Sequence, residues 1–210
     1  LGALTQLVQA GKVRSFGSST FPAEQIVEAQ WVAERRGRER FMTEQPPYSI
    51  LVRGIERDVL PVAQSYGMGV IPWSPLAGGW LSGRFGQGLD NTSRRAARLP
   101  DRYDLGLPAN QRKLEIVTEL ASVAAEAGLS LIELALAFVL EHPAISAAII
   151  GPRTMEHLES QLSAPGVRLE PAVLDRIDAL VAPGTNVNSE DAGWQPAALT
   201  DSRRRRRSRR

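Results

Sequence analysis

The chain has 210 residues, of which 43% are hydrophobic and 23% charged, and it contains no cysteine. This length allows one large domain or two small ones with a sizeable core, and the missing cysteines exclude disulfides and thiolate chemistry. No apolar run approaches the roughly 20 residues that span a bilayer. The first ten residues lack the basic and long apolar regions of a signal peptide, so we expect a cytoplasmic protein without membrane contact.

The formal net charge of +2 comes from the C-terminal end of the chain. Seven arginines lie within 203–210, whereas the residues before 201 include 18 basic and 22 acidic side chains. Such a run could neutralise nucleic-acid or membrane phosphates, or it could be a solvated, disordered tail. Because no aromatic residues alternate with the arginines, the sequence favours a disordered Arg-rich tail at 196–210 and does not favour nucleic-acid binding.

Strand-like and helix-like segments alternate along 1–195. Helical periodicity and end signals predict helices at 4–10, 22–36, 55–65, 112–127, 130–142, 155–162 and 171–181. Short apolar runs predict strands at 13–16, 41–45, 70–73 and 147–150. This alternation indicates an α/β fold with parallel strands and right-handed crossovers, and open sheets and closed barrels both fit it.

Small and polar residues follow each predicted strand, at 17–20, 44–45, 73–79 and 151–154. In parallel α/β proteins the chemistry gathers at these carboxyl ends. Trp73 offers a flat ring, and Arg153 beside a helix N-terminus favours an anion. The sequence thus predicts a cradle for a nucleotide with a planar, amide-bearing ring, although Trp73 as a core aromatic and Gln45 as a structural amide are alternatives. The chain has neither G-x-G-x-x-G nor G-x-x-x-x-G-K-[ST].

Four motifs in this order carry a family resemblance. They are Gly11-Lys12-Val13-Arg14 with Gly17-Ser18-Ser19, Glu44-Gln45-Pro46-Pro47-Tyr48, Trp73-Ser74-Pro75-Leu76-Ala77-Gly78-Gly79, and Ile150-Gly151-Pro152-Arg153-Thr154. Together they are similar to the carboxyl-terminal half of aldo-keto reductases, closest to bacterial members related to potassium-channel beta subunits. The resemblance covers 1–194 and implies a partial (β/α)8 TIM barrel, namely the last four parallel β/α units plus an extra helix, forming one half-barrel domain at 1–195.

The resemblance also implies NADP(H) as cofactor and assigns its contacts. The nicotinamide carboxamide would be held by Ser19, Thr20 and Gln45, with Trp73 stacked on the ring. The pyrophosphate would be lined by Ser74, Pro75, Leu76, Ala77 and Gly78, with Arg84 and Arg94 closing over it. The adenosine 2′-phosphate end would face Gly151, Arg153, His157, Ser160 and Gln161. Thr20 and the pair Ser160-Gln161 depart from the usual family residues, which leaves the choice between NADP and NAD open.

The family reduces carbonyls with a Tyr acid assisted by Lys, Asp and His, all from its first four strands. The tyrosines Tyr48, Tyr66 and Tyr103 do not match that motif, so we predict no catalytic residue and no metal in this chain. The resemblance implies an oxidoreductase that moves a hydride between NADPH and a small-molecule aldehyde or ketone, with this chain inactive alone. The alternative is a non-catalytic nicotinamide-nucleotide-binding or interaction module. Two open strand edges predict self-association in either case.

Overall fold

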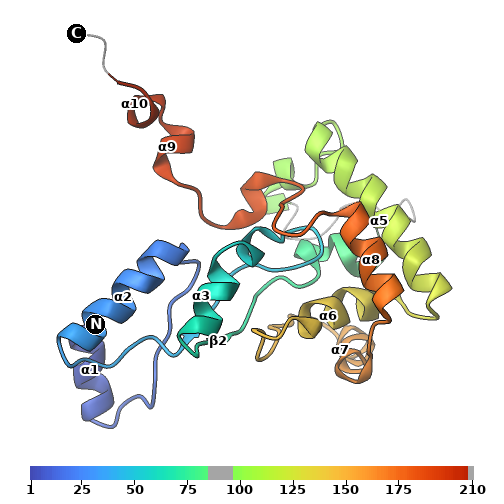
Figure 1. The fold of residues 1–210 in the computed structure, drawn as a ribbon. Helices are drawn as coiled ribbons and strands as arrows, with labels where there is room; N and C mark the ends of the chain where they lie inside the picture. Colours follow the sequence, from blue (N-terminus) through green and yellow to red (C-terminus); the bar gives the residue numbers. More distant parts are fainter. Residues whose placement is uncertain (85–96, 208–210) are drawn as a thin grey trace.

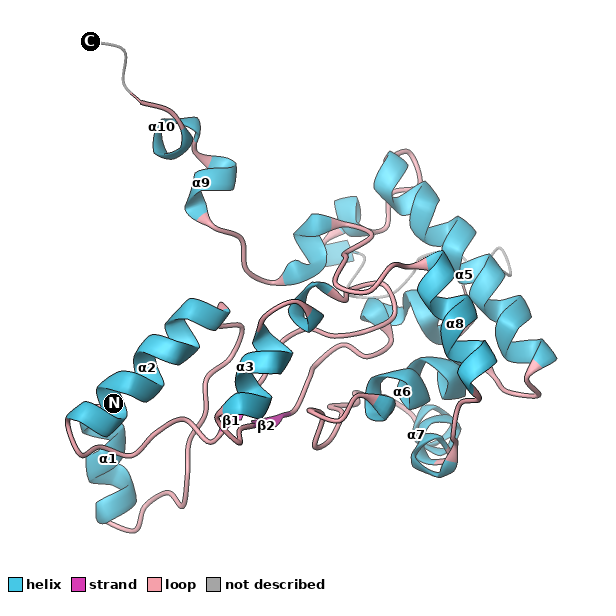
Figure 2. Cartoon of the chain, viewed as in Figure 1, coloured by secondary structure: helices cyan, strands magenta, loops and turns pink. Residues whose placement is uncertain are grey.

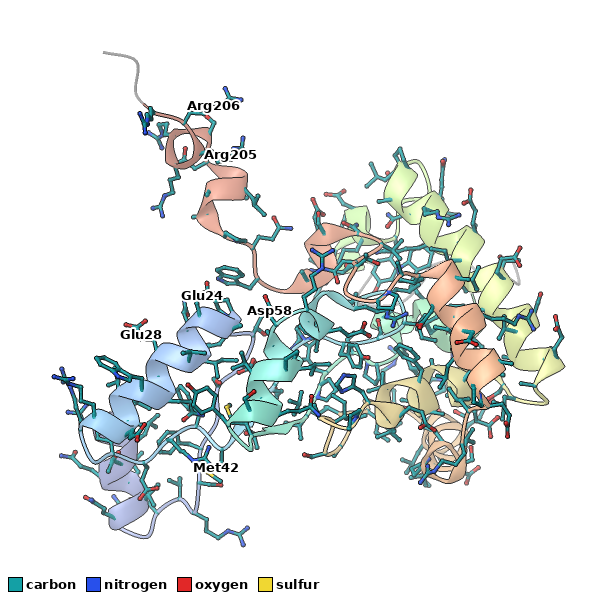
Figure 3. All side chains as sticks on the ribbon, in the orientation of Figure 1. Glu24, Glu28, Met42, Asp58, Arg205 and Arg206 are labelled. Carbon is teal, nitrogen blue, oxygen red and sulfur yellow. The ribbon has the colours of Figure 1, made fainter. Side chains whose placement is uncertain are left out.

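The computed structural model describes residues 1–84 and 97–207 of the chain. Most of the ordered backbone is helical, and the parallel strands are short (Figures 1 and 2). The helices α1 and α2 lie at one end of the molecule and α5 to α8 at the other, with α3 and the strands between them (Figure 1). Figure 3 shows the side chains that fill the space between these elements. This α/β arrangement is consistent with part of a (β/α)8 barrel.

The seven helices predicted from periodicity and end signals are confirmed. The longer helices of the described residues are α1 (Gly2–Gln9), α2 (Ala23–Arg35), α3 (Val59–Ser65), α5 (Pro108–Glu126), α6 (Leu131–Glu141), α7 (Met155–Leu162) and α8 (Pro171–Leu180). Short 3-10 turns are η1 (Gly54–Glu56), η2 (Ala77–Ser82), η4 (Pro100–Arg102), η5 (Ala164–Gly166) and η6 (Ser189–Ala192). The predicted helix at 55–65 is therefore divided into η1 and α3.

Side-chain caps explain why two of these helices begin where they do. The Ser130 hydroxyl accepts from the Glu133 N–H at 3.2 Å, and the Glu133 carboxylate accepts from the Ser130 N–H at 2.9 Å. This reciprocal pair is the capping box that the sequence predicted for α6. The Thr154 hydroxyl accepts from the His157 N–H at 3.2 Å and begins α7 in the same way.

Four extended segments lie side by side in parallel. β1 (Thr43–Glu44) pairs with β2 (Gly69–Val70), while single bridges join Ser18 to Glu44 and Val70 to Ile145. Further bridges join Pro47 to Trp73 and Trp73 to Ile149, so the pairing continues toward the carboxyl ends. The ends of all four segments therefore meet at one rim of the molecule.

The strands are shorter than the sequence predicted. The segment at 13–16 is not a strand, because Val13 and its neighbours Arg14 and Ser15 are exposed and pairing begins only where Met42 N donates to Phe16 O. At 147–150 the structure forms bridges at Ile145 and Ile149 without a continuous strand. Prolines at 46, 47 and 72 remove backbone donors from the middle segments, which limits β1 and β2 to two residues each.

The apolar core lies between the short strands and the helices. α6 is its central element: seven of its eleven residues are buried, and it packs against α5, α7, η2 and η5. Within the described residues no single helix is long and apolar enough to cross a membrane. The pair α5 and α6, bent by 91° at its break, meets the length and composition requirement together.

A buried ion-pair network fixes the loop after β1. Arg53 is 4% exposed; its Nε donates to Glu56 at 2.8 Å, and its Nη1 donates to Asp178 at 2.7 Å and to the Val181 carbonyl at 2.6 Å. Burial lowers the pKa of Arg53, but the bonds to the two carboxylates outweigh this and the net shift is upward. The Tyr48 hydroxyl donates to Glu56 at 2.8 Å, so the network connects this loop to the end of α8.

The sequence predicted a disordered Arg-rich tail at 196–210. Two single-turn helices, α9 (Ala197–Thr200) and α10 (Ser202–Arg205), form within it and extend away from the other helices (Figure 1). Asp201 caps the second by accepting from the Arg203 N–H at 3.0 Å. Residues 208–210 lie outside the described residues, and disorder of this segment in solution stays a prediction.

Candidate functional site

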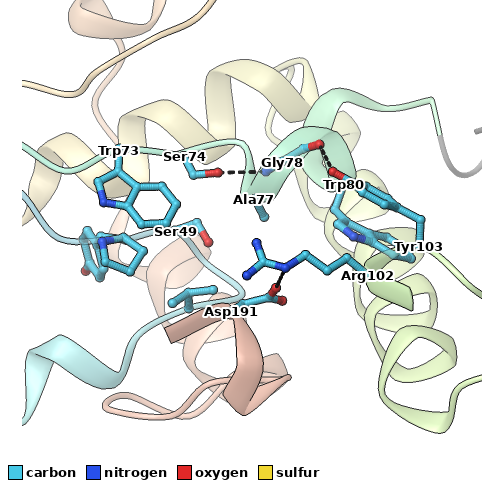
Figure 4. Close-up of a pocket in the computed structure, with 12 residues that line it drawn as sticks. Ser49, Trp73, Ser74, Ala77, Gly78, Trp80, Arg102, Tyr103 and Asp191 are labelled. Atoms are coloured by element: carbon cyan, nitrogen blue, oxygen red, sulfur yellow. Dashed lines mark hydrogen bonds and ion pairs between the residues drawn. The ribbon is translucent and has the colours of Figure 1, made fainter. Parts of the chain in front are cut away.

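A pocket opens where the chain leaves β1 and β2 (Figure 4). It contains about 390 Å³ of empty space, part of which is open to solvent. Its lining residues are Pro47, Tyr48, Ser49, Val52, Trp73, Ser74, Ala77, Gly78, Trp80, Arg102, Tyr103 and Asp191. Four of the residues predicted to contact a cofactor, at 73, 74, 77 and 78, are in its wall.

Strained backbone gathers at the same rim. Among the described residues, positive φ outside glycine occurs at Thr20 (58°), Ser74 (62°) and Ala77 (50°). For residues with a Cβ this left-handed conformation costs about 1–2 kcal/mol each, and it is least expected for a β-branched residue such as threonine. All three belong to the set predicted from the sequence to hold a cofactor. Strain of this kind concentrates at functional sites, so its position supports a binding role for this rim.

The loop after Trp73 is held by its own hydrogen bonds. The Ser74 hydroxyl accepts from the Gly78 N–H at 3.0 Å, and the Ser74 carbonyl accepts from the Ala77 N–H at 2.8 Å. Gly79 N–H donates to the Leu76 carbonyl at 2.9 Å. Two of the backbone donors expected to face a pyrophosphate, those of Ala77 and Gly78, are therefore already bonded within the loop. A phosphate bound here would have to share or displace them.

The first two segment ends bring the predicted carboxamide contacts together. The Ser19 hydroxyl donates to the Gln45 carbonyl at 2.9 Å, and Thr20 follows directly. Glu44, fully buried, accepts from the Ser18 hydroxyl and from the Phe21 N–H at 3.1 Å, which fixes the turn between them. Burial raises the pKa of Glu44, although these hydrogen bonds oppose the shift.

The residues predicted to contact the phosphate groups differ in their exposure and in the direction of their side chains. Arg84 Nη2 lies 2.7 Å from His157 Nε2, and because a guanidinium only donates, the imidazole nitrogen accepts. Ser160 and Gln161 both donate their side chains to the His157 carbonyl, at 3.0 and 2.7 Å, so they are directed at their own helix. Gly151 and Arg153 are exposed beside the start of α7.

The remaining residues predicted to contact the cofactor are Pro75, Leu76 and Arg94. Pro75 is buried and Leu76 packs against the core, so both side chains contribute to packing. Arg94 lies outside the described residues. The structure thus groups Trp73, Ser74, Ala77 and Gly78 in one pocket, with the pair Ser19 and Gln45 at the neighbouring segment ends.

Other residues in the pocket wall, and Lys113 behind it, were not predicted as site residues from the sequence. Trp80 and Tyr103 stack with ring centroids 6.1 Å apart and planes within 7°. Lys113, 1% exposed, forms an ion pair with Asp191, and its Nζ lies 5.4 Å from the Trp80 ring centroid. Arg102 Nε lies 3.8 Å from Asp191 (Figure 4). Trp80 belongs to η2, Arg102 and Tyr103 lie at η4, Lys113 is on α5 and Asp191 is in η6, so no single sequence motif joins them.

A tyrosine, a lysine and an aspartate therefore meet near this pocket, which the sequence did not predict. The Tyr103 hydroxyl donates to the Gly78 carbonyl at 2.9 Å, so its proton is directed at backbone. The Lys113 ammonium faces Asp191 and the Trp80 ring. This geometry does not present a proton to a ligand in the pocket. Over the described ranges, no three His, Cys, Asp or Glu side chains are grouped to hold a metal ion.

Comparison with known proteins identifies the family of this chain. The sequence profile of the Aldo/keto reductase family matches residues 1–182. The chain is 39% identical over 178 residues to the Uncharacterized oxidoreductase YrpG of Bacillus subtilis, covering 84% of this chain and 52% of that protein. It is 32% identical over 183 residues to the Putative voltage-gated potassium channel subunit beta of Schizosaccharomyces pombe, covering 85% and 53%.

A third relative is the Putative aryl-alcohol dehydrogenase C977.14c of Schizosaccharomyces pombe, 32% identical over 170 residues, or 80% of this chain and 46% of that protein. The chain belongs to the aldo/keto reductase family, whose fold is a (β/α)8 barrel. It spans about half the length of the curated relatives it matches.

Proposed function

We propose that this chain is the cofactor-binding part of an NADP(H)-dependent oxidoreductase that interconverts a carbonyl compound and an alcohol. The observation that carries the proposal is the position of Trp73, at a segment end and in the wall of a pocket that it shares with the strained residues Ser74 and Ala77. The family generally binds NAD(P)H and acts on small carbonyl substrates. Several relatives are named as oxidoreductases or dehydrogenases.

The residues at the rim fit the chemistry of such a cofactor. The indole of Trp73 would stack on the nicotinamide ring, and Ser19 with Gln45 would bind the carboxamide, since together they offer a hydroxyl and an amide. Arg84 and Arg153 would contact phosphate groups, for which guanidinium has matching geometry. When bound, the reduced cofactor supplies the hydride, and the pocket would hold the carbonyl compound beside it.

A second candidate is a non-catalytic nicotinamide-nucleotide-binding or interaction module. It is favoured by the direction of the Tyr103 hydroxyl, which is bonded to the Gly78 carbonyl, and by the pairing of Lys113 with Asp191. A positioned proton donor contributes about 10²–10⁴-fold to rate. Both candidates bind the nucleotide, and they differ in whether the bound nucleotide takes part in a reaction.

The first experiment is a titration with NADPH, followed by quenching of tryptophan fluorescence. We expect saturable quenching, and we expect Trp73→Leu to weaken affinity about tenfold, because base–aromatic stacking contributes about 1–3 kcal/mol. Trp31→Leu is the matched control, since Trp31 is 53% exposed on α2 and distant in sequence from the rim. No quenching at millimolar NADPH would count against both candidates.

The second experiment measures oxidation of NADPH with a simple aldehyde. We expect no turnover from this chain by itself, since the Tyr103 hydroxyl is bonded to backbone and the Lys113 ammonium is paired with Asp191. Sustained turnover that requires Tyr103 or Lys113 would show that these groups deliver a proton to the substrate as general acids. In that case the non-catalytic candidate is rejected.

A further inference from the structure

One side of the pocket contains a buried hydroxyl that the protein itself does not use. Ser49 is 1% exposed, and its Oγ has no hydrogen-bond partner. Its backbone N–H and carbonyl are both bonded to Val52, at 3.1 and 3.0 Å, so the residue is fixed in place. A buried polar group left unpaired is destabilising, so a ligand that bonds to it gains affinity. Figure 4 shows this hydroxyl directed into the pocket toward the guanidinium of Arg102.

Arg102 brings a positive charge whose contacts within the protein are long. Its Nε lies 3.8 Å from Asp191, and its Nη2 donates to the Glu190 carbonyl at 3.3 Å. Charge-assisted bonds of this type are normally about 2.7–2.9 Å, and a guanidinium has five N–H donors. Most of the donor capacity of Arg102 therefore remains for a ligand.

The charges around Asp191 do not cancel. Its carboxylate forms a close ion pair with Lys113 and only a distant one with Arg102. Among the described residues of this wall, two cations share one carboxylate, which leaves an excess of one positive charge. The Asp191 carboxylate would repel a dianion placed beside it. A single negative charge in a planar group is therefore the best match to this wall.

We propose that Arg102 and Ser49 bind the carboxylate of a small organic acid whose apolar part lies against Trp73. The planar guanidinium can bind both oxygens of a carboxylate, and the Ser49 hydroxyl donates to one of them. Resting on the proposed function, this names the substrate class as carbonyl compounds that also carry a carboxylate.

The test uses benzoate as the probe and tryptophan fluorescence as the readout, because Trp73 and Trp80 line the pocket. We expect saturable binding of benzoate, and binding at least about tenfold weaker for the neutral analogue benzamide. Arg102→Gln should weaken benzoate binding at least about tenfold and Ser49→Ala about three- to tenfold. Arg112→Gln is the matched control, since that arginine is 58% exposed and pairs with Glu115 on the surface of α5.

Each outcome decides between the alternatives. Equal binding of benzoate and benzamide, or benzoate affinity unchanged in Arg102→Gln, would overturn the carboxylate site. Tighter binding of inorganic phosphate than of benzoate would assign the wall to phosphate. Thermal unfolding of each variant shows whether it is folded, and Ser49→Ala tests the site with the smallest structural change.

The same titrations separate this inference from the proposed function. NADPH binding without benzoate binding overturns the inference and leaves the proposed function standing. Benzoate binding that depends on Arg102, without NADPH binding, rejects the proposed function and keeps a carboxylate site. Failure of both ligands rejects both.

Discussion

Replacing Arg53 by methionine should unfold this protein more readily than any comparable change at its surface. Methionine keeps much of the apolar volume over the Phe138 ring, which lies 5.0 Å from the guanidinium carbon. The change removes the donors to Glu56, Asp178 and the Val181 carbonyl. Glu56, whose side chain is 12% exposed, would keep neutral donors but lose its cation.

Breaking a buried ion pair from one side costs about 3–5 kcal/mol. For a domain of this size, about 2–4 °C of melting temperature is lost per kcal/mol, so Arg53→Met should lower the midpoint by roughly 6–20 °C. The assay is urea and thermal unfolding followed by circular dichroism. Since native domains have about 5–15 kcal/mol of stability, this loss is a large fraction of the total.

The matched control is Arg176→Met. Arg176 pairs with Glu126 at 2.6 Å, a distance as short as those of Arg53, but the two side chains are 46% and 63% exposed. Water solvates both charges after the pair is broken, so no measurable change is expected. Equal destabilisation by the two substitutions, or a loss below about 1 kcal/mol for Arg53→Met, would refute the argument that burial determines the effect.

Three further predictions follow from the fold. Burial raises the pKa of Glu44 above its ordinary value of 4.5, so the folded chain holds this proton more tightly than the unfolded chain. The contribution of Glu44 to the free energy of unfolding should be fully present below pH 4.5 and be lost as the pH rises through the raised pKa. In urea unfolding, the difference between the original chain and Glu44→Gln should change with pH over that range. Ser130→Ala removes the capping box of α6 and should lower the free energy of unfolding by about 1 kcal/mol, whereas Ser122→Ala on the exposed side of α5 should leave it unchanged in the same urea titration. The segments at 16–18 and 145–149 each pair on one side only among the described residues, so sedimentation should show self-association, and a stable monomer at all concentrations would contradict this.

The helices could be predicted because their end signals are local. Ser130 with Glu133, and Thr154 three residues before His157, form the caps that their spacing indicates. The parallel order of the four segments followed from the alternation of strands and helices. Strand length could not be predicted in the same way. It depends on which backbone donors are missing, as at Pro72, and on whether a residue such as Val13 is covered by neighbouring elements or left exposed.

The pocket could be predicted only where it is made by one continuous segment. Trp73, Ser74, Ala77 and Gly78 are close in sequence, and all four are in its wall. By contrast Ser49, Arg102 and Asp191 come from three segments far apart in sequence, which meet only after the helices have packed. The unpaired Ser49 hydroxyl and the unequal sharing of Asp191 between two cations are properties of that packing, so the sequence carries no sign of them.

The choice of residues in the strained turns separates a binding rim from an ordinary turn. Glycine adopts positive φ without steric cost, and this chain uses it at helix ends such as Gly37 and Gly128 and also at Gly78 in the pocket wall. At Ser74 and Ala77 it keeps a Cβ in the same conformation, and both side chains line the pocket. The Ser74 hydroxyl also fixes the Gly78 N–H, which a glycine could not do. The backbone strain is therefore retained where a side chain is needed at the pocket wall, as expected if the wall is shaped for a ligand.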